Sequence, residues 1–227
     1  MSTPLKIDFI SDVSCPWCII GLRALDQALE HLGDEVQAQI HFQPFELNPK
    51  MVPEGQEIFE HISEKYGSTQ EQYKTNAENF RERGAELGFV FKQGGRRIYN
   101  TFDAHRLLHW AALEDKGHEG KQKALKEALF TAYFSQHANV SSHTVLADVA
   151  QKTGLDRKQA EEVLSSGQYT DEVRELERLW TSRGVSSVPT IVFNDQYAVT
   201  GGQPVDVFVG AIRQIVSEQG SVVSAPD

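Results

Sequence analysis

Strand patterns occur only near the two ends of this 227-residue chain, and this arrangement restricts the fold more than any other feature. Apolar residues alternate over residues 6–10, and an apolar stripe at helical spacing follows over residues 18–32. A second alternating run covers residues 36–42 and ends at Pro44. The chain is therefore predicted to begin as β-α-β, with parallel strands and a right-handed crossover because a helix joins them.

The end of the chain returns to strand character. Short apolar runs at residues 190–193 and 197–199 flank a turn, and a final helix is predicted to begin at Pro204. Residues 220–227 are expected to form a loose tail. This half is therefore predicted to be β-β-α.

Helical patterns separated by glycines fill the region between the two halves. The predicted helices cover residues 56–66, 69–87, 101–116, 121–137, 143–153, 157–164 and 171–182. A β-α-β half and a β-β-α half make up a thioredoxin fold, so we predict an α/β protein with a thioredoxin-like fold and a large all-helical insertion. We assign residues 1–53 and 184–227 to a discontinuous thioredoxin-like domain, and residues 54–183 to the inserted helical domain.

The composition excludes several classes of partner. A formal net charge of -10 opposes binding to nucleic acid and to anionic membrane surfaces. The first residues do not combine a basic segment with a long apolar run, and no stretch is apolar enough to span a bilayer, so we expect a cytoplasmic protein with no membrane partner. Both cysteines lie in one motif, which leaves no disulfide framework and is typical of a reactive pair in a reducing compartment.

The motif Cys15-Pro16-Trp17-Cys18 lies where the first predicted strand passes into the first predicted helix. Only a thiolate attacks a disulfide, and unpaired backbone N–H groups at a helix N-terminus favour the thiolate. We therefore predict that Cys15 is an accessible nucleophile and Cys18 the resolving thiol. Pro16 fixes the backbone of the first turn, and Trp17 is expected to cover the site and contact substrate. Asp12 is expected to cap the preceding turn.

A Cys-x-x-Cys pair can also be half of a zinc site. Two more ligands would be needed, and His105 and His109, one helical turn apart, are the candidates. Nothing in the sequence places them around the cysteines, so no metal is predicted. A non-enzymatic zinc-binding or chaperone module is kept as an alternative of a different class. The strand before the motif and the helix after it favour redox chemistry.

The segment Val188-Pro189-Thr190 precedes the first strand of the β-β-α half. Proline is tolerated at the start of a strand, where this one lies. A cis bond between Val188 and Pro189 would turn the Val188 backbone towards the cysteines, where its N–H and C=O groups can pair with an extended substrate.

Five segments, in this order along the chain, resemble a known family. They are Ser11-Asp12-Val13-Ser14-Cys15-Pro16-Trp17-Cys18, Pro44-Phe45-Glu46-Leu47-Asn48-Pro49, Asn100-Thr101-Phe102-Asp103-Ala104-His105-Arg106-Leu107, Val188-Pro189-Thr190 and Gly201-Gly202-Gln203-Pro204. Together they resemble the FrnE-type branch of the DsbA family. The resemblance implies a DsbA-like fold, protein-disulfide oxidoreductase or isomerase activity, and a cis proline at Pro189 facing Cys15.

The resemblance also implies that Asn100 and His105, from the inserted helices, line the cleft and bind substrate. Judged from the residues alone, Asn100 is equally well a helix cap. His105 is equally well a packing histidine, although a histidine near the thiols could also move protons during exchange.

The resemblance leaves a second enzyme class open. Kappa-type glutathione transferases and 2-hydroxychromene-2-carboxylate isomerases belong to the same superfamily. They typically carry serine where this chain has Cys15, and Gly-x-Asp-Arg where it has Gly202-Gln203-Pro204, so both departures favour dithiol chemistry. We expect no tightly bound cofactor, and protein or small-molecule thiols and disulfides as partners. Glutathione is a candidate reductant or co-substrate.

Overall fold

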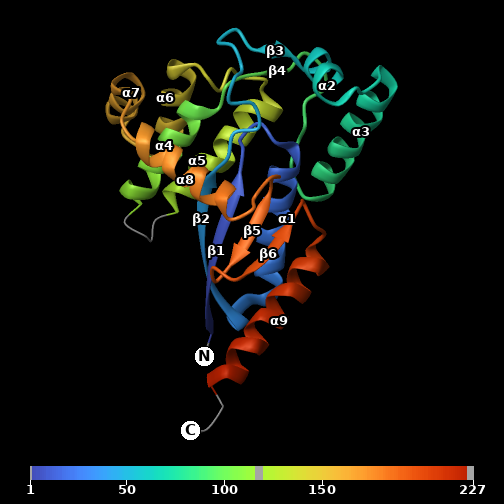
Figure 1. Cartoon of the computed structure of the whole chain (residues 1–227), viewed down its shortest axis with the longest axis vertical. Helices are drawn as coiled ribbons and strands as arrows, with labels where there is room; N and C mark the ends of the chain where they lie inside the picture. Colours follow the sequence, from blue (N-terminus) through green and yellow to red (C-terminus); the bar gives the residue numbers. More distant parts are fainter. Residues whose placement is uncertain (1, 116–119, 224–227) are drawn as a thin grey trace.

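A four-stranded mixed sheet brings the two ends of the chain together (Figure 1). The computed structural model describes residues 2–115 and 120–223, without the side chains of residues 220–223. The strands are β1 (Thr3–Ser11), β2 (Val36–Pro44), β5 (Thr190–Phe193) and β6 (Tyr197–Thr200), in the order β2-β1-β5-β6. β1 pairs in parallel with β2 and antiparallel with β5. The predicted β-α-β and β-β-α halves are therefore confirmed, and they share one sheet.

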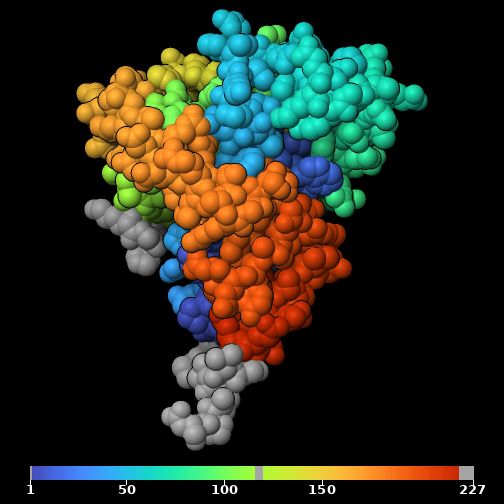
Figure 2. Space-filling model, viewed as in Figure 1, coloured from blue at the N-terminus to red at the C-terminus, as the bar shows by residue number. Residues whose placement is uncertain are grey.

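Two helices from the ends of the chain pack against each other beside the sheet: α1 (Pro16–Leu32), between β1 and β2, and α9 (Val205–Val223), after β6 (Figure 1). Their buried leucine, isoleucine and phenylalanine side chains join the core formed by β1. On the face drawn in Figure 2, only small patches of the N-terminal segment, coloured blue, reach the surface. This agrees with the central position of β1 in the sheet.

The predicted loose tail is wrong for residues 220–223, because α9 continues to Val223. A glycine within a helix costs only about 1 kcal/mol relative to alanine, so Gly220 does not end it. Residues 224–227 of the predicted tail lie outside the described residues.

The region between the two halves is mainly helical, and its helices gather at one end of the sheet (Figure 1). They are α2 (Ile58–Tyr66), α3 (Gln70–Glu86), α4 (Phe102–Glu114), α5 (Lys121–Phe130), α6 (His143–Lys152), α7 (Arg157–Ser166) and α8 (Thr170–Ser182). A π-helical turn, Thr131–Ser135, extends α5, but the prediction of helix to residue 137 is wrong. His137 has a φ of 57°, which a right-handed helix does not allow. Residue 116, the predicted end of another helix, lies outside the described residues.

The inserted region also contains two short strands, so the prediction that it is all-helical is wrong in this detail. β3 (Gln56–Glu57) pairs antiparallel with β4 (Arg97–Ile98), and the predicted helix from residue 56 begins instead at Ile58. The Arg97 guanidinium adds hydrogen bonds to the carbonyl groups of Glu54 and Gly55. Strands of two residues are too short to produce an alternating pattern. These two form because segments distant in the sequence pair with each other.

The insertion covers the outer edge of the sheet. The Gln122 side chain of α5 accepts a hydrogen bond from the Phe42 N–H (3.0 Å) and donates one to the Phe42 carbonyl group (3.1 Å). The amide therefore pairs with the edge strand β2 as a neighbouring strand would. The same side chain donates to the carbonyl group of Leu108 in α4 (3.3 Å). One glutamine thus ties β2, α4 and α5 together.

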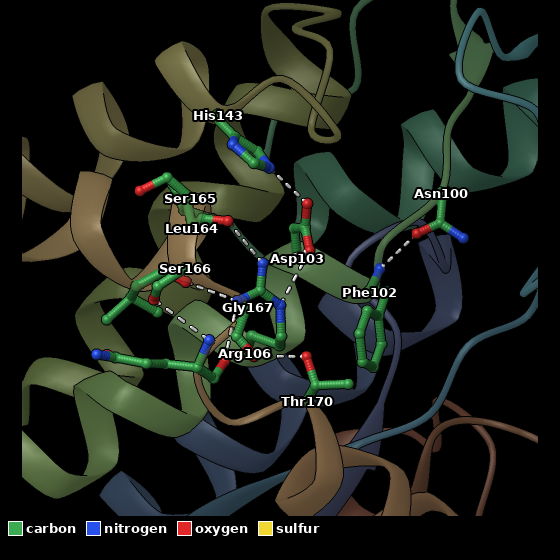
Figure 3. Close-up of polar contacts among 12 residues, drawn as sticks. Asn100, Phe102, Asp103, Arg106, His143, Leu164, Ser165, Ser166, Gly167 and Thr170 are labelled. Atoms are coloured by element: carbon green, nitrogen blue, oxygen red, sulfur yellow. Dashed lines mark hydrogen bonds and ion pairs between the residues drawn. The ribbon is translucent and has the colours of Figure 1, made fainter.

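A buried arginine in α4 holds the end of α7 (Figure 3). Arg106 donates hydrogen bonds to the carbonyl groups of Val163 (2.6 Å) and Leu164 (3.0 Å), which lie in the last turn of α7. Asp103, on the same helix as Arg106, forms an ion pair with it at 2.7 Å. The guanidinium thereby satisfies carbonyl groups that the helix end leaves unpaired, and α4 is fixed against its neighbours.

None of the helices in residues 2–115 and 120–223 is both long enough and apolar enough to cross a membrane.

Candidate active site

The motif Cys15-Pro16-Trp17-Cys18 forms the first turn of α1, as predicted from the sequence. Cys15 is the N-cap residue, with extended backbone angles, and Pro16 is the first helical residue. The Cys15 N–H donates to the Asp12 carbonyl group (3.2 Å), and the Cys18 N–H donates to the Cys15 carbonyl group (3.1 Å). Both cysteines are free thiols. The turn places two sulfur atoms at the N-terminus of a helix, where backbone N–H groups remain available.

The Val188–Pro189 peptide bond is cis and lies beside Cys15. The Cys15 thiol donates a hydrogen bond to the Val188 carbonyl group at 3.5 Å. The next carbonyl group, that of Pro189, accepts from the Gly201 N–H (2.8 Å). Within the described part of the chain, the Val188 N–H has no hydrogen-bond partner. Segments from opposite ends of the sequence therefore meet at the first cysteine.

Two glycines allow α1 to approach this loop closely. A Cβ atom on Gly21 would lie 3.2 Å from Pro189 Cγ and 3.3 Å from Gly202 Cα. A Cβ atom on Gly202 would lie only 2.9 Å from the Trp17 carbonyl oxygen. The backbone of the Gly201-Gly202 segment therefore packs directly on the first turns of α1, and larger residues would separate the motif from the cis proline.

The cysteines are less accessible than expected for a nucleophile and its partner. Cys15 is 4% exposed and Cys18 is fully buried, so the expectation that Cys15 is accessible is wrong. Trp17 is 36% exposed, as its predicted role as a cover requires, but one side of it is occupied by α3. Phe80 lies edge-on to its ring at 5.1 Å, and the Arg83 guanidinium lies over the ring at 5.2 Å.

Burial is the main influence on the second thiol. It raises the pKa of Cys18 well above its usual value, and the neighbouring Cys15 raises that pKa further. A nearby lysine, Lys126 of α5, acts in the opposite direction. At neutral pH the Cys18 side chain is therefore a protonated thiol.

Asp12 holds the loop around the motif together. It accepts hydrogen bonds from the Ser14 N–H (3.1 Å), as the predicted cap does, and from the Leu47 N–H (2.7 Å). Burial alone would raise the pKa of this carboxyl group, but the interaction with His105 and the two backbone hydrogen bonds lower it below its ordinary value. Asp12 is therefore a buried carboxylate, linking the cysteine turn to the loop after β2.

His105 in α4 and Asn100, just before α4, are the predicted substrate-binding residues of the insertion, and they lie in different surroundings. The His105 ring lies beside Asp12, with Nε2 3.8 Å from Oδ1, and is buried. Asn100 donates hydrogen bonds to Glu46 (3.2 Å) and to the Pro49 carbonyl group (3.3 Å). Its side-chain oxygen accepts from the Phe102 N–H (2.9 Å), the contact drawn in Figure 3. The bond from Phe102 fits the cap interpretation, whereas the other two join Asn100 to the segment after β2, and substrate binding by Asn100 stays a prediction.

Lys126 is a site residue that the sequence reasoning missed. Its amine is fully buried, and its strongest electrostatic partners are Cys18, Asp12 and Cys15. The only signal in the sequence was a lysine on the apolar side of a predicted helix, between Leu125 and Leu129. That signal is weak, because lysines commonly lay their methylene groups along apolar surface.

The geometry does not assemble the zinc ligands considered above. Across residues 2–115 and 120–223, no group of three or more His, Cys, Asp and Glu side chains is placed to hold a metal ion. His109 packs on the Tyr169 ring at 5.2 Å, whereas His105 lies at Asp12. The two histidines therefore contact different partners.

The chain matches the model of a known protein family. The model of the DSBA-like thioredoxin domain matches residues 6–213, which include most of β1, the other three strands of the main sheet and the inserted helices. The chain belongs to the DSBA-like thioredoxin domain family. The predicted DsbA-like fold and family are therefore confirmed, and this is a family of thiol–disulfide oxidoreductases. The FrnE-type branch stays a prediction.

Similar proteins support the same assignment. The crystal structure of a probable DsbA oxidoreductase from Streptomyces coelicolor is 31% identical, with a TM-score of 0.86, and the match covers 92% of this chain and 89% of that one. The uncharacterized protein YwbO of Bacillus subtilis is 26% identical over 210 residues, covering 92% of this chain and 96% of the relative. The cytosolic disulfide reductase DsbM from Pseudomonas aeruginosa, solved with GSH, has a TM-score of 0.61 at 14% identity, covering 92% and 98% of the two chains. This last likeness concerns the fold alone.

Proposed function

We propose that this DsbA-like protein is a protein-disulfide oxidoreductase or isomerase in which Cys15 is the nucleophile and Cys18 the resolving thiol. One observation carries the proposal: the Cys15 sulfur lies at the N-terminus of α1 and contacts the Val188 carbonyl group, next to a cis proline. The pKa of Cys18, raised by burial, supports the assignment of roles, because a protonated thiol is a poor first nucleophile.

In the proposed cycle, the Cys15 thiolate attacks one sulfur of a substrate disulfide. A bond forms between them, and the second substrate sulfur leaves with the bonding electrons. Cys18 then loses its proton and attacks the Cys15 sulfur, the Cys15–Cys18 disulfide forms, and the remaining substrate sulfur leaves as a thiolate. The substrate is reduced by two electrons and the dithiol is oxidised. Substrate oxidation is the same sequence in reverse.

Backbone and ring surfaces around Cys15 supply the proposed substrate contacts. The unpaired Val188 N–H is suited to donate a hydrogen bond to the backbone carbonyl group of an extended peptide. Trp17 and the prolines Pro16 and Pro189 offer apolar contact beside it. We propose that His105, which lies beside Asp12, and Asn100, which is hydrogen-bonded to Glu46, also line the substrate cleft.

Three finer assignments belong to the same proposal. We place the protein in the FrnE-type branch because the five motif segments lie in order along the chain. We propose a cytoplasmic location, where a dithiol pair without structural disulfides stays reduced. Small thiols such as glutathione are proposed as reductant, since the protein of similar fold from Pseudomonas aeruginosa was solved with GSH.

Single-cysteine variants test the proposed roles. With a peptide disulfide as substrate, Cys15→Ser is expected to abolish both turnover and mixed-disulfide formation. Cys18→Ser is expected to form the mixed disulfide but not to release it, so that a stable adduct at Cys15 accumulates in mass spectra. Undiminished turnover in both variants would eliminate the dithiol mechanism, and an adduct at position 18 would reverse the roles.

A further inference from the structure

Lys126 is a buried cation that the dithiol cycle alone does not explain. Its side chain has no exposed surface, and its Nζ atom has no hydrogen-bond partner among the described residues. The amine lies 5.1 Å from the centre of the Phe130 ring. Moving an ammonium group from water into the protein interior without hydrogen bonds is strongly unfavourable. Lys126 therefore lowers the stability of the fold, which suggests that it has a function.

Two ion pairs link α5, which carries Lys126, to α1, which carries the cysteines. Arg23 of α1 forms an ion pair with Glu127 of α5 at 3.6 Å, and Asp26 forms one with Lys123. The two helices therefore run antiparallel, and residues further along α5 lie nearer to the start of α1. Lys126 lies between these two paired residues of α5, its side chain is buried, and Cys18 of the first turn of α1 is its strongest electrostatic partner.

Lys126 also lines a cavity of about 190 Å³. His105 and His109 of α4 and His41 of β2 share the cavity wall. The cavity reaches the surface, because His41 is exposed. It has room for water molecules. His105 Nε2, buried beside Asp12, also lacks a hydrogen-bond partner within the described residues. Two protonatable groups therefore lie between the covered motif and a water-accessible space.

We propose that Lys126 takes up the proton of the Cys18 thiol and passes it to solvent through this cavity. The proposal rests on the dithiol function above. Cys18 is fully buried and cannot give its proton directly to bulk water. The neutral amine of Lys126 accepts the proton, the Cys18 thiolate attacks Cys15, and the substrate sulfur leaves with the electron pair. The ammonium then releases the proton through the cavity, which restores the amine.

The charges around Lys126 fit a base that works near neutral pH. Burial lowers the pKa of Lys126 to about 8, while Cys18, Asp12 and Cys15 act to raise it. The other titratable groups across the cavity are His41, His105 and His109. Efficient general bases have a pKa near the working pH, and such proton transfer typically contributes a factor of about 10² to 10⁴ in rate.

The two steps can be timed separately with a symmetrical aromatic disulfide whose thiolate is coloured. Attack by Cys15 releases the first coloured equivalent, and resolution by Cys18 releases the second. Stopped-flow traces of the wild-type protein, Lys126→Met and the control Lys123→Met would be recorded between pH 6 and pH 10. Lys123 lies one turn away on the same helix and is paired with Asp26 at a partly exposed site. This control therefore removes one lysine from α5 without removing the buried amine.

In Lys126→Met, we expect the second release to slow by about a hundredfold at pH 7.5, with a much smaller change in the first. The wild-type second release should show an inflection near pH 8 that is absent from Lys126→Met and kept in Lys123→Met. An unchanged rate and pH profile of the second release in Lys126→Met would overturn the proposal. If that variant does not fold, a wild-type second release without an inflection between pH 7 and pH 9 would do so. Failure of wild type to release even the first equivalent would instead count against the proposed dithiol function.

Discussion

The buried amine of Lys126 makes a stability prediction with a defined sign. Burial lowers its pKa from 10.5 to about 8. Between these pH values the unfolded chain binds more protons than the folded one, so the free energy of unfolding rises as the pH increases. Below pH 8 the folded state bears the whole cost of burying the ammonium group. At about 1.4 kcal/mol for each tenfold change in the dissociation constant, the fall in pKa corresponds to about 3 kcal/mol.

Lys126→Met removes the charge and keeps an unbranched side chain of similar length. We expect the free energy of unfolding at pH 7 to increase by about 3 kcal/mol, since an apolar group replaces a buried charge. The gain should shrink between pH 8 and pH 10.5 and then disappear. Urea unfolding followed by circular dichroism measures it. Both proteins should carry Cys18→Ser, because burial raises the pKa of that thiol and its titration would enter the same range.

The control for this comparison is Lys123→Met, which removes a partly exposed ion pair with Asp26. Such pairs contribute up to about 1 kcal/mol, and no dependence on pH between 8 and 10 is expected. The reasoning fails if Lys126→Met is no more stable than its parent at pH 7, or if a gain persists unchanged at pH 10.5. Either result would mean that folding does not depress the pKa of this amine.

Two further substitutions test the close contacts that shape the site. Gly202→Ala places a methyl group 2.9 Å from a carbonyl oxygen of the cysteine motif, and we expect it to lower the free energy of unfolding by about 1–3 kcal/mol in urea titrations. Gly210→Ala, in open space on α9, is the matched control and should show no loss. Gln122→Ala leaves the Phe42 N–H and C=O groups unpaired, so a loss of about 1–3 kcal/mol is expected. The Phe42 amide should also exchange its hydrogen faster, and a wild-type exchange rate would contradict the pairing.

The parts of the fold that the sequence predicts are those whose periodicity reports burial directly. The alternation over residues 6–10 marks β1, which is enclosed by neighbours on both edges. The stripe over residues 18–32 marks α1, whose leucines enter the core. The position of the cysteine turn follows from these two elements, because the motif lies at the start of α1, only a few residues after the end of β1.

Features that depend on a distant partner were not predictable in the same way. β3 and β4 exist only because residues about forty positions apart meet, and neither has a pattern of its own. The position of Trp17 depends partly on α3, whose Phe80 and Arg83 reach the ring from the insertion. The motif alone does not predict this contact, nor the burial of Cys15 and Cys18.

The inserted helices do more than enclose the thioredoxin-like half. The cysteines and Asp12 come from the start of the chain and Val188 from its end, but the titratable side chains facing them, His105 and Lys126, come from α4 and α5. The protonation of Cys18 therefore depends in part on a side chain of the insertion, which the cysteine motif does not encode. Two family members with the same four motif residues can thus differ in the rate of the resolving step, because a single position on α5 decides whether a base faces Cys18.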